Sequence, residues 1–122
     1  MAAMLKEVHP VLAVRDVEGS LAFYAKLGFS LSFTDASSNA AYVGIRRDAV
    51  ELHLQWHAEA DFEKGNRPVY RFVVDDVDAL SAEFEGAGMA LDRTEVNDTP
   101  WGTREFHVRD PDGNGLQFYR DL

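Results

Sequence analysis

Imidazole and carboxylate side chains give this chain the groups that bind metal ions or move protons in enzymes. His9 stands at the start of the apolar run "EVHPVLAVRDV" (7–17), and Glu51 and His53 alternate with apolar residues in "AVELHLQW" (49–56). Glu105 and His107 alternate with apolar residues in "TREFHVR" (103–109). Because successive side chains of a strand point to opposite faces, each Glu-His pair is predicted to share one face of its strand.

His53 and His57 do not form a metal site of their own. Their spacing in "HLQWH" is the spacing of a zinc pair on a helix. On a strand the same residues are about 13 Å apart, at a rise of roughly 3.3 Å per residue. One ion cannot reach both, so we expect His57 at the surface near the end of the strand.

An internal duplication supplies the elements that position these groups. "VRDVEGSLAFYAKLGFSL" (14–31) and "VDDVDALSAEFEGAGMAL" (74–91) align at a constant offset of 60 residues without a gap. A repeat of this kind indicates a duplicated supersecondary unit. The identical pairs are Val14/Val74, Asp16/Asp76, Val17/Val77, Ala22/Ala82, Gly28/Gly88 and Leu31/Leu91.

Each repeat is predicted to form a βαβββ module in an α+β domain. Asp16 and Asp76 stand where a helix N-cap belongs, and Gly28 and Gly88 are typical helix stop signals. We expect helices near 17–26 and 77–86. The predicted strands are 8–15, 29–34, 40–45 and 49–56 in module one (about 8–56), and 68–74, 89–95, 102–108 and 114–119 in module two (about 68–119). The polar segment 57–67 is the predicted linker.

Strand alternation separates a predicted core from a polar face. The apolar set, which includes Trp56, is expected to pack against the two helices. A solvated sheet face or a face covered by a partner subunit would show the same alternation. A mixture of imidazoles, carboxylates, amides and a guanidinium is nevertheless typical of a small-molecule site. The polar face comprises His9, Glu51, His53, Gln55, Arg71, Glu105, His107, Gln117 and Tyr119.

Composition limits the possible partners. The 122 residues suit a single domain, and the absence of cysteine excludes disulfides and thiolate sites. A net charge of −9 disfavours binding to nucleic acid or anionic membranes and favours a cationic ligand, although such a charge also serves solubility alone. No run is long enough for a signal peptide or a membrane span, so we expect a cytoplasmic protein.

Taken together, these motifs resemble the vicinal oxygen chelate superfamily, which includes glyoxalase I, bleomycin resistance proteins, extradiol dioxygenases and fosfomycin resistance enzymes. The resemblance rests on the doubled βαβββ pattern, "VLAVRDVEGSLAFYAKLGF" (11–29) and "VRDPDGNGLQF" (108–118). "PWGTREFHVRDPDGN" (100–114) and Pro10 look most like the bleomycin resistance branch. The resemblance implies a homodimer with a cup-shaped mixed sheet, helices on its outer face and ligand sites near the subunit interface.

Metal-using members of this superfamily take four ligands from the first and last strands of the two modules. The resemblance places those positions here at His9, Glu51, Val69 and Gln117. Valine cannot bind a metal and a neutral amide is a poor ligand, so we expect no metal cofactor. The alternative is a divalent metal held by His9, Glu51 and Gln117, with His53 or His107 completing an unusual set.

The resemblance favours a metal-free binding protein that sequesters a bleomycin-like cationic aromatic antibiotic and thereby confers resistance. Flat aromatic walls and negative charge would hold such a ligand. Trp101, on a turn, and Phe33, at the position of an aromatic wall in bleomycin-binding relatives, are the best walls, although Trp101 could simply anchor its loop. The predicted ligand-binding residues are Trp101, Phe33, Phe62, His53, Arg71, Glu105, His107 and Tyr119.

Arg71 departs from this pattern, because close bleomycin binders carry an apolar or aromatic residue there. Its charge would repel a cation unless Glu51 or Glu105 neutralises it, and it suits an anionic or carbonyl-bearing ligand. Two other functions therefore stay open. One is a metal-dependent glyoxalase or lyase in which Glu105 moves protons, and the other is a binder whose ligand is neither drug nor metal.

Overall fold

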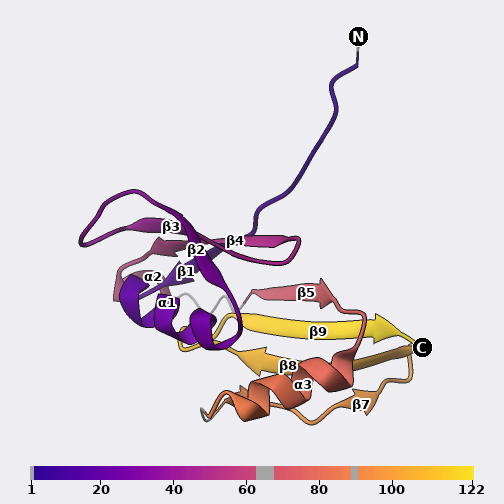
Figure 1. The fold of residues 1–122 in the computed structure, drawn as a ribbon. Helices are drawn as coiled ribbons and strands as arrows, with labels where there is room; N and C mark the ends of the chain where they lie inside the picture. The colour runs from indigo at the N-terminus through magenta and orange to yellow at the C-terminus, as the bar shows by residue number, and fades with distance from the viewer. Residues whose placement is uncertain (1, 63–67, 89–90) are drawn as a thin grey trace.

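A computed structural model describes residues 2–62, 68–88 and 91–122 (Figure 1). Module one contains β1 (Val11–Val14), α1 (Val17–Lys26), β2 (Ser30–Thr34), β3 (Tyr42–Arg47) and β4 (Val50–Trp56). Module two contains β5 (Val69–Val73), α3 (Val77–Gly86), β6 (Asp92–Arg93), β7 (Asn97–Asp98), β8 (Thr103–Arg109) and β9 (Gly115–Asp121). The short helix α2 (Glu59–Phe62) lies between the modules. The α+β class and the doubled βαβββ order are confirmed, with one additional short strand, β7, in module two.

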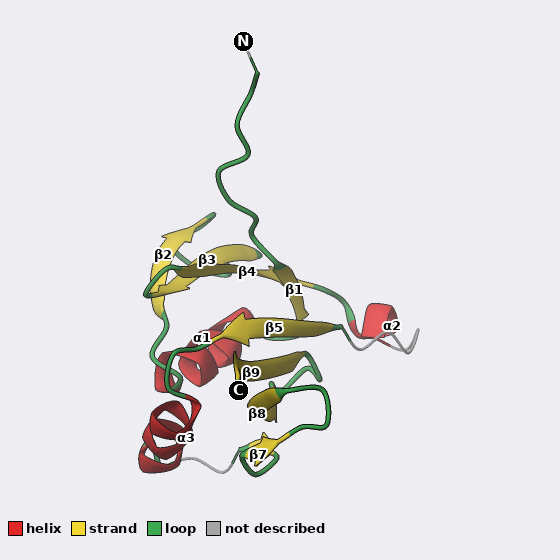
Figure 2. Cartoon of the chain, turned by 90° about the vertical axis from the view of Figure 1, so that its right-hand side faces the viewer, coloured by secondary structure: helices red, strands yellow, loops and turns green. Residues whose placement is uncertain are grey.

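Each module builds its own mixed sheet. The strand order is β1-β4-β3-β2 in the first sheet and β5-β9-β8-β6 in the second, where β7 also pairs with β8. The first strand of each module runs parallel to the last, and the other pairings are antiparallel. Helix α1 contacts β2, β3 and β4, and α3 contacts β8 and β9. In Figure 2 the helices α1 and α3 lie at the left, with β5, β9 and β8 to their right and the first sheet above α1.

The duplicated motif forms the same local structure in both modules. Asp16 accepts a hydrogen bond from the backbone N–H of Gly19 at 3.1 Å, and Asp76 accepts one from Ala79 at 3.0 Å. These contacts satisfy N–H groups that the first helical turn leaves unpaired. Gly28 and Gly88 have φ angles of 90° and 73°, which favour glycine after a helix. Both predicted helices and their caps are confirmed.

Several strand boundaries differ from the prediction. Strand β1 begins after Pro10 and not at residue 8, and residues 2–8 extend away from the body of the protein (Figure 1). Proline has no N–H to donate, although the Pro10 carbonyl still accepts from the His53 N–H at 2.9 Å. The strand predicted over 89–95 is reduced to β6, with 89–90 outside the described residues, and β7 was not predicted. The predicted linker contains α2, and 63–67 lie outside the described residues.

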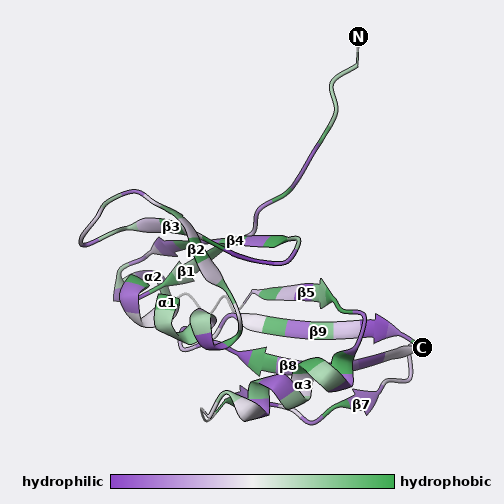
Figure 3. Cartoon of the chain, in the orientation of Figure 1, coloured by the Kyte–Doolittle hydropathy of each residue, from purple (hydrophilic) through white to green (hydrophobic). Residues whose placement is uncertain are grey.

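The predicted core face is confirmed in most positions. Side chains such as Leu12, Leu54, Phe72 and Leu116 are buried, and one apolar cluster extends through both modules. Figure 3 shows hydrophobic and hydrophilic residues interleaved along β5 and β9. The prediction that Trp56 packs against the helices is wrong, because its side chain is 52% exposed. Trp56 is the last residue of β4, and it lines a surface groove together with Arg15, Asp16 and the first residues of α1.

A buried polar junction joins the modules. The Tyr24 hydroxyl of α1 donates to Oδ2 of Asp110 at 2.8 Å, and the Asn114 amide donates to the same oxygen at 2.9 Å and to the Ala13 carbonyl at 3.0 Å. Burial raises the pKa of Asp110 above its ordinary value, although the Asn114 and Tyr24 hydrogen bonds oppose the shift. The junction holds α1 and β1 against the turn between β8 and β9.

We expect Tyr24→Phe to lower the free energy of unfolding by about 1–3 kcal/mol. The buried Asp110 carboxylate then loses a hydrogen-bond donor that water does not replace. Urea unfolding followed by circular dichroism measures this change. Tyr70→Phe is the matched control, since its hydroxyl makes a longer hydrogen bond of 3.3 Å to the Val11 carbonyl in a more exposed position. Equal losses of unfolding free energy in the two variants would show that the Asp110 junction stabilises the fold no more than a partly exposed hydrogen bond does.

Candidate functional site

The first group of candidate side chains lies on β2, β3, β4 and the segment before β1. We call Phe33, Tyr42, Glu51 and His53, together with His9, the module-one patch. Nε2 of His53 lies 2.9 Å from Oε2 of Glu51, and Nε2 of His9 lies 3.4 Å from the same oxygen. The Tyr42 hydroxyl lies 2.7 Å from Nδ1 of His53. Arg46 donates to the other Glu51 oxygen at 3.1 Å.

Strand register explains this convergence. Positions 42, 44 and 46 of β3 alternate with the buried Val43 and Ile45, and Gly44 pairs with His53 across the antiparallel ladder. Pairing of β1 with β4 places Pro10, and hence His9, at the same end of β4. The pKa of Glu51 is below its ordinary value, first because of the hydrogen bond from His53, with a further contribution from Arg46, although burial acts in the opposite direction.

Phe33 adds an aromatic surface to the module-one patch. Its ring is 40% exposed, stacks on Tyr42 at a centroid distance of 6.1 Å, and meets the His53 ring edge-on at 5.0 Å. The register of β2 and β3 shifts between Leu31 and Phe33, and the ring then lies directly over Gly44. A Cβ atom at position 44 would overlap the ring. The glycine therefore determines where this wall stands.

The second group lies on β5, β8 and β9, and we call Arg71, Glu105, His107, Gln117 and Tyr119 the module-two patch. Glu105 is only 3% exposed and accepts hydrogen bonds from Thr103 at 2.6 Å and Arg71 at 3.3 Å. Nε2 of His107 lies 2.7 Å from its other oxygen. Arg71 also donates to Gln117 at 2.7 Å and lies over the Tyr119 ring at 4.0 Å. The charge of Arg71 is thus matched by Glu105.

The environment of Glu105 strongly favours its ionised form. Burial alone would raise its pKa, but the donors Thr103, His107 and Arg71 outweigh that effect and lower the pKa to about 2. A carboxylate of this kind is a poor proton acceptor near neutral pH, because it holds a proton only in strong acid. The arrangement favours a positioning role for Glu105 over the proton-transfer role that the enzyme hypothesis gives it.

A groove of about 380 Å³ connects the two patches at the edge of β5. Its lining includes His9, Arg46 and Glu51 from module one and Tyr70 and Arg71 from module two.

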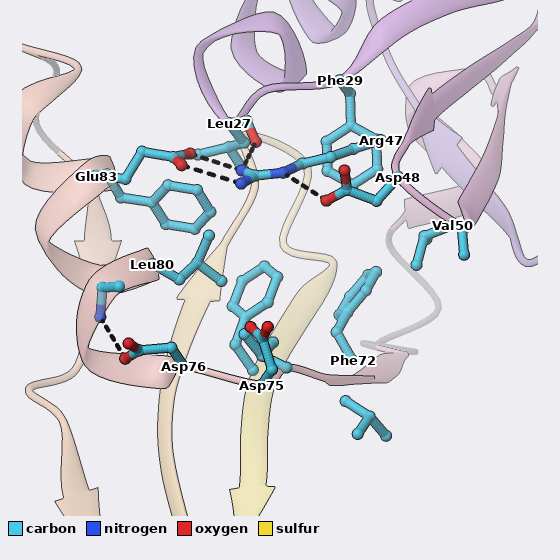
Figure 4. A pocket seen from close by; sticks show the side chains of 16 residues that line it. Leu27, Phe29, Arg47, Asp48, Val50, Phe72, Asp75, Asp76, Leu80 and Glu83 are labelled. Carbon is cyan, nitrogen blue, oxygen red and sulfur yellow. Dashed lines mark hydrogen bonds and ion pairs between the residues drawn. The ribbon is translucent and has the colours of Figure 1, made fainter.

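A larger cavity of about 490 Å³ lies between the end of α1, the turn after β3 and helix α3 (Figure 4). Arg47 at its rim is already bonded to Glu83 at 2.6 Å and to the Leu27 carbonyl at 2.8 Å. None of the predicted site residues lines this cavity, whereas His9, Glu51 and Arg71 line the groove, so the groove is the candidate site, with Phe33 and His53 outside its lining.

The structure separates the predicted site residues into groups. Phe33, His53, His9 and Glu51 meet in the module-one patch. Gln117, predicted as a metal ligand beside His9 and Glu51, instead accepts a hydrogen bond from Arg71 in module two. Phe62 lies under the Arg15 guanidinium at 3.9 Å, away from the hydrogen bonds of both patches. Trp101, in the turn between β7 and β8, is 67% exposed. Whether these residues bind a ligand stays a prediction.

Three contributors to the patches were not singled out from the sequence: Tyr42, Arg46 and Thr103. Each lies on the same strand face as residues that were, because "YVGIRR" and "TREFHVR" alternate polar or small residues with buried apolar ones. Extending the alternation to β3 would have found Tyr42 and Arg46. Their specific partners depend on strand register, which alternation alone does not give.

Glu105 should make folding stability depend on pH in acid. Its pKa is lowered in the folded state from an ordinary 4.5 to about 2, so its stabilising contribution is complete above pH 4.5 and is lost as the pH falls toward 2. We expect the difference in unfolding free energy between the wild type and Glu105→Gln to shrink across this window. Urea unfolding at several pH values tests this.

Glu83→Gln serves as the control, because Glu83 pairs with Arg47 at a half-exposed position where ion pairs contribute little. A difference between wild type and Glu105→Gln that stays constant from pH 6 to pH 2 would contradict the pKa shift.

Comparisons with known proteins agree with this architecture. The profile of the Glyoxalase/Bleomycin resistance protein/Dioxygenase superfamily matches residues 7–118. An uncharacterized protein of Mycolicibacterium smegmatis is 36% identical over 112 residues, which cover 92% of this chain and 90% of the relative. A bleomycin resistance protein of Geobacillus stearothermophilus is 27% identical, over 98% of both chains.

Among solved structures, the bleomycin-binding protein from bleomycin-producing Streptomyces verticillus, complexed with copper(II)-bleomycin, is 31% identical. The match has a TM-score of 0.74 and covers 94% of this chain and 97% of that one. The duplicated βαβββ modules, the profile match over nearly the whole sequence and these relatives lead to one conclusion: the chain belongs to the glyoxalase/bleomycin resistance protein/dioxygenase superfamily.

Proposed function

We propose that this protein binds a planar aromatic ligand carrying positive charge, of the bleomycin type, and sequesters it without transforming it. The observation that carries the proposal is the wall formed by Phe33, which is half-exposed and adjoins the ionised Glu51 through His53. An aromatic face beside a carboxylate suits a flat cation better than it suits an anion. The bleomycin resistance protein of Geobacillus stearothermophilus and the copper(II)-bleomycin complex of the Streptomyces verticillus protein support the same ligand class.

Electrostatics also support a cationic ligand. The net charge of −9 would attract such a ligand over distances beyond direct contact. Arg71, which by itself would oppose the ligand, is neutralised by Glu105 and held against Gln117 and Tyr119. The guanidinium is therefore part of the groove lining and not a free anion-binding group.

We further propose that the working form is a cytoplasmic homodimer. Apolar side chains of the sheet edges are exposed in the single chain, notably Leu31, Val69 and Val73. A second copy would cover them and enclose the groove. Among the residues that the structure describes, no helix has the length and apolar character that crossing a membrane requires.

Isothermal titration with bleomycin, with and without Cu(II), tests the proposed ligand. We expect saturable binding, weakened roughly tenfold by Phe33→Ala or Trp101→Ala, since loss of one stacking partner with its buried area corresponds to about 1.4 kcal/mol. Trp56→Ala is the matched control, because Trp56 is exposed outside both patches and should leave the affinity unchanged.

An absence of binding heat at tens of micromolar protein, for both metal-free and copper-loaded drug, would exclude bleomycin as the ligand. Equal weakening by Trp56→Ala and Phe33→Ala would exclude the module-one patch as its site.

A further inference from the structure

We propose that His9, Glu51 and His53 form a binding site for one divalent transition-metal ion, built entirely within module one. One nitrogen of each imidazole and one carboxylate oxygen all lie within 4.8 Å of one another. The shared point is Oε2 of Glu51, at 3.4 Å from Nε2 of His9 and 2.9 Å from Nε2 of His53. The inference does not depend on the identity of the organic ligand.

The two distances to Oε2 of Glu51 are close to those around a small metal ion, and the two imidazole nitrogens lie within 4.8 Å of each other. Zinc binds imidazole nitrogen at about 2.0–2.1 Å and carboxylate oxygen at about 2.0–2.2 Å, so two ligands on a tetrahedral centre are about 3.3–3.4 Å apart. The His9–Glu51 separation already has this value, and the His53–Glu51 separation needs to open by only a few tenths of an ångström. Two histidines and one glutamate form an established zinc set that leaves one position open.

Neighbouring groups hold the three side chains in a suitable orientation. Tyr42 contacts Nδ1 of His53 at 2.7 Å, and when its hydroxyl accepts from Nδ1–H, Nε2 is the nitrogen available to a metal. Arg46 binds Oε1 of Glu51 at 3.1 Å and leaves Oε2 facing the imidazoles. The ring centroids of His9 and His53 are 4.8 Å apart, which keeps both imidazoles over the same carboxylate.

Glu7 competes for this position. Its Oε2 lies 2.8 Å from Nε2 of His9, in the exposed segment before β1. Since the Glu7 side chain is 59% exposed, it can turn into solvent at little cost or bring a further oxygen to the ion.

This set differs from the one that family resemblance implies, which is spread over both modules. There, Val69 offers no donor atom, and the Gln117 oxygen is held by Arg71 in module two. His53, two residues after Glu51 on the same face of β4, supplies the third ligand instead.

Module two contains a natural comparison. Glu105 and His107 repeat the Glu-x-His pairing on β8, with 2.7 Å between oxygen and Nε2. Thr103 and Arg71 bind the other oxygen of that carboxylate, as Arg46 does for Glu51 in module one. Among the described residues no second imidazole lies beside Glu105, so module two offers one ligand fewer for a metal ion.

Titration of the chelator-treated full-length protein with Co²⁺ and Zn²⁺ tests the inference. We expect one equivalent of metal ion per chain and, with Co²⁺, the visible ligand-field bands of a four-coordinate ion. Competition with a chromophoric chelator measures the Zn²⁺ affinity. His9→Gln and His53→Gln should each lower the zinc affinity at least tenfold. Tyr42→Phe should lower it roughly tenfold, because Tyr42 contacts the ligand His53. His107→Gln should leave zinc affinity unchanged, and circular dichroism checks that every variant is folded.

The inference is overturned if the wild type binds neither ion at micromolar concentration, if folded His53→Gln keeps wild-type affinity, or if His107→Gln weakens zinc as much as His53→Gln does. Bleomycin titration of metal-free protein separates the two proposals. Drug binding without zinc binding contradicts only the metal site, and zinc binding without drug binding contradicts only the proposed function.

Discussion

Asp110 connects the two modules, and the geometry of the groove depends on it. This buried carboxylate receives Tyr24 from α1 and Asn114 from its own turn, while Asn114 also reaches the backbone of β1. Ionisable groups are rarely buried without partners, because the loss of hydration costs several kcal/mol. Here the partners come from both modules, so the satisfied arrangement exists only when the modules are docked. The groove lined by Glu51 and Arg71 lies between the same two modules.

Much of the fold could be predicted because it is encoded locally. The N-cap aspartates Asp16 and Asp76 and the stop signals Gly28 and Gly88 act within a few residues of the helices they delimit. Strand alternation likewise placed Glu51 with His53 and Glu105 with His107. Trp56 shows the limit of alternation, because a side chain at the end of a strand is buried only where a neighbouring element covers it, and Trp56 is 52% exposed.

Assembly of the candidate site depended on information that is not local. The family resemblance places His9, Glu51 and Gln117 in one ligand set, yet only pairing between strands decides which of them meet. Parallel pairing of β1 with β4 brings His9 to Glu51, whereas β5 and β9 commit Gln117 to Arg71. The two Glu-x-His motifs thus have similar internal geometry and an arginine on each carboxylate, but a second imidazole, His9, lies only beside Glu51 among the described residues.

Gly44 has a consequence for how ligand preference can change in this protein. The Phe33 ring occupies the space that any side chain at position 44 would need, and the backbone there has no positive φ that demands glycine. A single substitution could therefore tilt the aromatic wall while the strand ladder remains intact. The aromatic surface can then diverge among relatives one residue at a time, without any change in the elements that maintain the fold.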